Sequence, residues 1–164
     1  MMSNQEAIQR FWQAYLESLP PQNVRPTRYE AWGFGHGAQM ADDLGALVVE
    51  GVKTATCSLL WLYEVEGEPV PSVGDYSIIL DGAGAHICII ETTEVTICLY
   101  NEVDAHFAYD EGEGDRSLDY WRAAHWDFFG RECAQMALRV HSVNGRTLSE
   151  EMPLVCERFQ VVYR

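Results

Sequence analysis

Hydrophobic and polar residues follow two different periods along the chain, and these periods predict its secondary structure. Ser3-Asn4-Gln5-Glu6 has the pattern of a capping box, and the apolar residues from Ile8 to Leu19 recur at helical spacing until Pro20-Pro21. The same spacing predicts helices over about 38–50, 102–109 and 117–129, with Gly130 after the last. We therefore expect an N-terminal helix over about 3–19 and three further helices.

Alternating or continuous apolar runs predict the strands. They cover 53–63, 76–80, 86–91, 94–99 and 154–163, and Asp81-Gly82-Ala83-Gly84 is a suitable hairpin connection between the second and third. Residues 20–31 are rich in proline and predict an irregular segment, while 131–150 give no clear pattern. Helices and strands do not strictly alternate, which favours an α+β fold with a mixed or antiparallel, curled sheet and flanking helices.

Length and charge narrow the class of protein. A chain of 164 residues is expected to form one domain over 1–164, with the helix at 3–19 as an extension. Its net charge of −14 argues against binding duplex DNA or an anionic membrane, yet it is compatible with binding one or two nucleotides. No apolar run reaches membrane length, and five cysteines without a C-x-x-C pair predict a reduced, cytoplasmic protein without a zinc ribbon or disulfide scaffold.

Lysine usage singles out one position. Ten of the 11 basic residues are arginine, and Lys53 is the single lysine, within Gly51-Val52-Lys53-Thr54-Ala55-Thr56. Lysine can lose its proton when desolvated and arginine cannot, so a buried Lys53 is a candidate base that activates the Thr56 hydroxyl or a water. The alternative is a solvated Lys53 beside a helix C-terminus, which the motif alone favours.

An acidic, glycine-spaced loop is the second candidate. Glu111, Glu113 and Asp115 alternate within it and supply groups for acid–base chemistry or for a hard cation, although the spacing is not that of an EF-hand. The alternative is a solvated loop before a helix. The histidines lack a metal-binding spacing, and His125 is expected to be a hydrogen-bonded core residue, so neither a metal nor a cofactor is predicted.

Aromatic residues could line a pocket near these groups. Trp32, Phe34 and Tyr63 are candidates to stack on a planar ring, and ordinary core packing is the alternative for each of them. The glycine-rich segment Gly33–Gly37 opens a helix, but no strand–helix–strand unit surrounds it. It is therefore weak evidence for phosphate binding.

Taken together, several motifs make the chain resemble an ASCH domain. They occur in family order: Trp32-Gly33-Phe34-Gly35, Gly51-Val52-Lys53-Thr54-Ala55-Thr56, Val73-Gly74-Asp75, Glu111-Gly112-Glu113-Gly114-Asp115-Arg116-Ser117-Leu118 with Trp121 and His125, and Cys156-Glu157-Arg158-Phe159. The resemblance implies a PUA-like fold, which is a small β-barrel with helices around it. It also implies a cleft for a nucleoside, a nucleotide or short single-stranded RNA.

The resemblance also implies an activity. One bacterial branch of the family hydrolyses N4-acetylcytidine with a lysine, a threonine and a glutamate, which correspond here to Lys53, Thr56 and Glu113, with Glu111 as the alternative glutamate. The residues expected around the substrate are Trp32, Phe34, Thr54, Tyr63, Glu111 and Asp115. The leading hypothesis is therefore hydrolysis of an N-acyl bond on a modified nucleoside. The alternatives are an RNA-binding module and a metal-dependent ribonuclease that uses the acidic loop.

Overall fold

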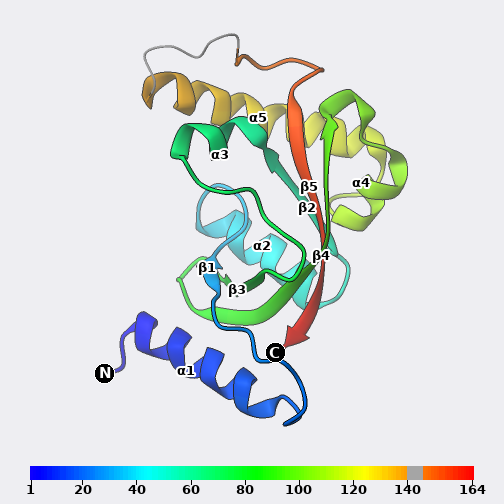
Figure 1. Ribbon diagram of the computed structural model, residues 1–164. Coiled ribbons are helices and arrows are strands. Elements are labelled where there is room, and N and C mark those ends of the chain that lie inside the picture. The colour runs from blue at the N-terminus through cyan, green and yellow to red at the C-terminus, as the bar shows by residue number, and fades with distance from the viewer. Residues whose placement is uncertain (140–145) are drawn as a thin grey trace. The chain divides into compact units, whose positions relative to one another are not determined.

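The computed structural model describes residues 1–139 and 146–164 (Figure 1). The helices are α1 (Asn4–Ser18), α2 (Ala38–Val49), α3 (Leu60–Glu66), α4 (Ala105–Glu111) and α5 (Leu118–Arg139), with a 3-10 turn, η1, at Tyr100–Glu102. The strands are β1 (Glu30–Trp32), β2 (Ala55–Leu59), β3 (Tyr76–Leu80), β4 (His86–Leu99) and β5 (Pro153–Tyr163). Among these described helices, none is long and apolar enough to cross a membrane.

The strands form a mixed sheet in the order β1-β3-β4-β5-β2. Strand β1 runs parallel to β3, whereas β3 with β4 and β2 with β5 are antiparallel pairs. A mixed sheet with helices confirms the predicted α+β class.

Contacts within the chain define two compact units. The first unit comprises residues 1–52, 73–93 and 159–164, and the second comprises residues 53–72 and 94–158. Strands β4 and β5 contribute residues to both units.

In the first unit, α1 forms because its start is capped and one of its faces is apolar. The Ser3 hydroxyl accepts a hydrogen bond from the Glu6 N–H, and the Glu6 carboxylate accepts one from the Ser3 N–H at 2.8 Å. Trp12 and Tyr15 on the apolar face are buried against residues of β3 and β4. The predicted N-terminal helix is thus confirmed.

The hairpin between β3 and β4 depends on a glycine at position 82. A Cβ added there would lie 2.4 Å from the carbonyl oxygen of Ala38, and the Gly82 N–H donates to the Asp42 carboxylate at 2.8 Å. We expect Gly82→Ala to destabilise the protein by about 1–3 kcal/mol, because the added methyl meets backbone that cannot move freely.

Gly130→Ala is the matched control for this prediction. Gly130 lies inside α5, where an added Cβ would have Leu148 at 3.5 Å as its nearest neighbour. We expect it to leave stability unchanged or raise it by up to about 1 kcal/mol, because alanine is the better helix former. Thermal unfolding of both variants checks the pair, and equal effects would contradict the close approach at Gly82.

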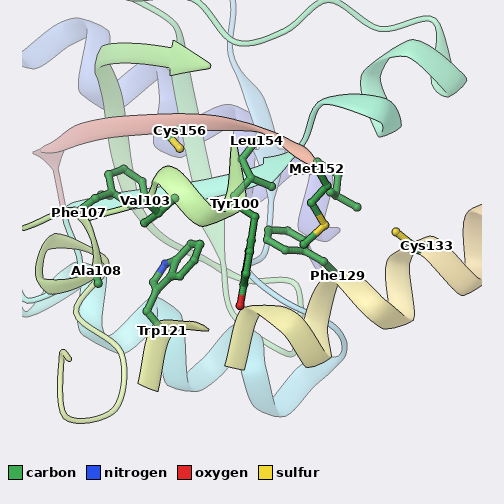
Figure 2. Packing of buried hydrophobic residues seen from close by; sticks show 12 residues of the cluster. Tyr100, Val103, Phe107, Ala108, Trp121, Phe129, Cys133, Met152, Leu154 and Cys156 are labelled. Carbon is green, nitrogen blue, oxygen red and sulfur yellow. The ribbon is translucent and has the colours of Figure 1, made fainter. Parts of the chain in front are cut away.

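The second unit has its own hydrophobic core, to which α5 contributes Trp121 and Phe129 (Figure 2). Trp121 and Phe129 of α5 are almost fully buried, as are Met152 and Leu154 near the start of the β5 segment. Tyr100 of η1 reaches into this core, and its hydroxyl donates to the carbonyl oxygen of Arg122 at 2.6 Å. This bond satisfies the polar end of a buried ring and fixes η1 against α5.

Four predicted boundaries differ from the structure. The strand expected over 53–63 is β2 followed by helix α3, and the helix expected to end before Gly130 continues to Arg139. Strand β1 lies within and just beyond the segment expected to be irregular, and the two strands expected over 86–99 are one strand, β4. Of the unassigned residues 131–150, the first nine belong to α5, and 140–145 lie outside the described residues.

Candidate functional site

The backbone of residues 53 and 54 is fixed against the end of α4. The Thr54 N–H donates to the carbonyl oxygen of Asp110 at 2.8 Å, and the Thr54 hydroxyl donates to the same oxygen at 3.3 Å. These bonds hold Lys53, which lies two residues before β2, and its side chain is only 2% exposed. The solvated alternative for Lys53 is therefore wrong.

Two carboxylates face this amine because α4 ends in a sharp turn. Asp104 caps the start of α4, and Gly112 ends it in the left-handed conformation at φ 74°, which a glycine adopts without strain. Glu111 is the last helical residue and Glu113 follows the turn. They are 1% and 15% exposed.

Distances show that Lys53 contacts both glutamates. Its Nζ lies 3.2 Å from Oε2 of Glu113 and 3.5 Å from Oε2 of Glu111, and it donates to the Glu111 carbonyl oxygen at 3.4 Å. The structure thus brings together Lys53 and Glu113, two of the three residues expected to be catalytic. It also places the alternative glutamate, Glu111, beside the same amine.

His125 of α5 completes the group on the side of Glu111. Its Nε2 lies 2.9 Å from Oε2 of Glu111 and 3.8 Å from Oε2 of Glu113. Its Nδ1 is 2.9 Å from the carbonyl oxygen of Trp121, one turn earlier, and the two rings stack at 4.3 Å. Lys53, Glu111, Glu113 and His125 are called the charged cluster below.

Electrostatics keep Lys53 positively charged. Burial lowers the pKa of its amine, but the attraction of Glu111 and Glu113 outweighs burial, so the pKa is raised above its ordinary value. Burial opposes the charge of Glu111 in the same way, yet Lys53 and His125 hold the pKa of this carboxyl below its ordinary value. A neutral Lys53 that acts as the base stays a prediction, and the direction of this pKa shift disfavours it.

Glu113 is the carboxyl of the charged cluster whose pKa is raised. Burial and the negative charge of Glu111 raise its pKa, against the opposing influence of Lys53. The pKa of His125 is raised as well, because Glu111 outweighs the effect of burial. Burial and Glu111 also raise the pKa of the nearby Cys57 thiol. A partly exposed carboxyl with a raised pKa is suited to transfer protons.

Thr56 occupies a different place from the other two residues expected to be catalytic. It lies within β2, opposite Glu157 of β5, and side chains alternate along a strand. Cys57, the next residue, lies close to Glu111 and His125. The side chain of Thr56 therefore projects from the face of β2 opposite to the one that Cys57 presents to the charged cluster.

The residues expected around the substrate belong to different units and differ in how exposed they are. Phe34 is 4% exposed within the core of the first unit, where Trp32 packs on it edge-to-face at 4.6 Å, so Phe34 is not free to stack on a ligand. In the second unit, the Tyr63 hydroxyl is hydrogen-bonded to Ser58 at 2.8 Å. The Asp115 carboxylate accepts a hydrogen bond from the Ser117 N–H at 2.9 Å. Asp115 is exposed and does not belong to the charged cluster.

Sequence reasoning underestimated two residues of the site. His125 is the hydrogen-bonded core histidine that was expected, but it also contacts Glu111, and Cys57 was not singled out. One local signal existed for His125. Trp121 and His125 are four residues apart on a helix, so they share the face that turns inward.

Comparisons with known proteins agree with this architecture. A crystal structure of an ASCH domain from Lactobacillus crispatus JV V101 is 38% identical, covers 97% of this chain and 96% of its own, and superimposes with a TM-score of 0.86. The protein EF3133 from Enterococcus faecalis V583 is also 38% identical, with coverage of 97% and 90% and a TM-score of 0.81. None of the curated proteins matches the chain. The family model for the ASCH domain matches residues 30–163, and the chain belongs to this family.

Proposed function

We propose that the charged cluster is the catalytic centre of a hydrolase that cleaves an N-acyl bond on a modified nucleoside. The observation that carries the proposal is the pair formed by Glu113 and Lys53, 3.2 Å apart, in which a partly exposed carboxyl with a raised pKa adjoins a buried ammonium group. The resemblance to the N4-acetylcytidine-hydrolysing branch supplies the substrate class.

In the proposed reaction, Glu113 carries the proton. Its carboxylate removes a proton from a water molecule, whose oxygen forms a bond to the acyl carbon. Glu113 then returns this proton to the departing nitrogen as the carbon–nitrogen bond breaks, which leaves a carboxylic acid and an amine. One group acts as base and then as acid, so the protons balance over the cycle.

Lys53 contributes its charge. The acyl oxygen becomes negative in the tetrahedral intermediate, and an ammonium group held in a water-poor environment stabilises such a charge far more than it would in water. Glu111 and Glu113 keep this ammonium group in place and charged. The attack is assigned to water, since Thr56 projects from the opposite face of β2.

The test is turnover of N-acylated nucleosides by the purified protein. We expect N4-acetylcytidine or a close analogue to be converted to cytidine and the free acid, as followed by chromatography. A Lys53→Arg variant is expected to lose most of this activity, because the larger planar guanidinium cannot place its charge at the same point in a buried site.

Two other results would overturn the proposal. If RNA is cleaved only in the presence of a divalent cation, the protein is a metal-dependent ribonuclease. If no acylated nucleoside is hydrolysed but single-stranded RNA binds with a steep dependence on salt, about −0.7 in the log–log slope for each phosphate contact, the family fold acts here as a binding module.

A further inference from the structure

Three groups with metal-binding atoms meet on one side of the charged cluster. Cys57 comes from β2, Glu111 from the end of α4 and His125 from α5. The Cys57 thiol, a carboxylate oxygen of Glu111 and a ring nitrogen of His125 all lie within 4.8 Å of one another. All three residues belong to the second unit, so one compact body sets their separation.

The histidine is oriented as metal-binding histidines usually are. Such residues donate one ring N–H to a carbonyl or carboxylate and direct the other nitrogen at the ion. Here Nδ1 of His125 lies 2.9 Å from the Trp121 carbonyl oxygen, and the stacked Trp121 ring restrains the imidazole. Nε2 is the nitrogen that faces Glu111, at 2.9 Å.

The carboxylate of Glu111 provides an independent observation. Both of its oxygens are buried, and within the described residues neither accepts a hydrogen bond of good geometry, although Lys53 and His125 lie close to Oε2. Buried carboxylates normally accept several hydrogen bonds, and a bound cation satisfies them equally well. An ion bound between Glu111, Cys57 and His125 would satisfy this buried carboxylate.

We propose that Cys57, Glu111 and His125 form a binding site for Zn²⁺. Sulfur, nitrogen and oxygen together favour zinc over magnesium or calcium, which require oxygen ligands. Three protein ligands leave the fourth position open to a water molecule.

Charge balance is compatible with the ion. A thiolate and a carboxylate offset the two charges of Zn²⁺, while Lys53 remains paired with Glu113 at 3.2 Å. Cysteine binds zinc as the thiolate and histidine as the neutral ring, so uptake releases protons and weakens as the pH falls. Lys53, 3.5 Å from Glu111, competes with the ion for this carboxylate.

The site is tested by metal binding to the full chain, so the result does not depend on the hydrolase proposal. We expect equilibrium dialysis to show one Zn²⁺ per chain, and Co²⁺ in its place to give the near-ultraviolet absorption band of a cobalt–thiolate bond. Cys57→Ser should abolish this band and weaken Zn²⁺ binding by more than about 100-fold, the upper range for loss of a residue that merely supports a ligand.

Two further variants make the assignment specific. Cys133→Ser removes another buried thiol of the second unit and should leave both the band and the affinity unchanged. Lys53→Met should tighten Zn²⁺ binding, because it removes the competing positive charge. Absence of zinc uptake by the wild-type protein, or a cobalt–thiolate band that persists in Cys57→Ser, would overturn the proposal.

Discussion

Lys53→Met is expected to destabilise the protein by about 3–5 kcal/mol at neutral pH, as loss of one partner of a buried ion pair typically does. The variant leaves the Glu111 carboxylate, which is 1% exposed, without its ammonium partner at 3.5 Å. Methionine has a similar length and fills the space, so lost packing contributes little. Urea unfolding, followed by circular dichroism, measures the difference in the free energy of unfolding.

The pH dependence of this effect follows from Glu111. In the folded wild type its pKa is lowered from 4.5, so the carboxylate contributes stability above that value, and this stability is lost as the pH falls through the folded-state pKa. In Lys53→Met the main cause of the lowering is gone, and Glu111 protonates at a higher pH than in the wild type. The stability difference between the two proteins should therefore shrink as the solution is acidified.

A double variant separates charge from packing. Lys53→Met combined with Glu111→Leu removes both charges and should recover much of the loss, because an apolar pair of similar volume often replaces a buried ion pair without cost. Glu111→Leu alone should be destabilising, since it leaves Lys53 with His125 and one carboxylate. If Lys53→Met costs less than about 1 kcal/mol at neutral pH, or if its cost does not change with pH, Lys53 does not bear a buried charge.

Local patterns in the sequence were sufficient to predict the elements that have a clear cap, stop or turn motif. The capping box at Ser3 and the two prolines after Leu19 define α1, and the hairpin glycines place the turn between β3 and β4. The antiparallel pairing of β2 with β5 was not predicted, because no local pattern reports which strands become neighbours.

Long-range packing overrode the local signals at two boundaries. Gly130 was expected to end α5, but Cys133 and Met136 continue the buried face that runs from Trp121 to Phe129, and this burial outweighs the cost of about 1 kcal/mol for a helical glycine. The apolar run Leu59-Leu60-Trp61-Leu62-Tyr63 is too short to separate a strand from a helix by period alone. Its first residue ends β2, and the others belong to α3.

The residues of the candidate site were predicted only in part. The single lysine and the glycine-spaced glutamates were candidates, and the family resemblance selected Lys53 and Glu113, with Glu111 as the alternative; the structure joins all three. The charge of the Lys53 amine was not predictable from the sequence, because it depends on having two carboxylates, rather than one, within 3.5 Å. Cys57 was missed because thiols in apolar strands are common and its neighbours come from distant parts of the chain.

Glu113→Gln is expected to lower kcat/KM for an N-acylated nucleoside by about 10²–10⁴-fold, the usual contribution of a well-placed proton-transfer group. Glutamine preserves the size of the side chain but can neither accept the proton of the attacking water nor return it to the nitrogen. Asp115→Asn is the matched control in the same loop. Asp115 is exposed and bonds to the Ser117 N–H, so its replacement should leave turnover unchanged.

The pH profile then distinguishes the roles of Glu113 and Lys53. With Glu113 as the base, wild-type kcat/KM falls on the acid side with a midpoint above 4.5, because the pKa of this carboxyl is raised, and the Glu113→Gln variant loses that acid limb. With Lys53 as a fixed cation, activity also falls at alkaline pH, above 10.5, where the ammonium group loses its proton. An activity that instead rises steadily with pH until Lys53 is neutral would show that the amine is the base and would contradict the assignment of this step to Glu113.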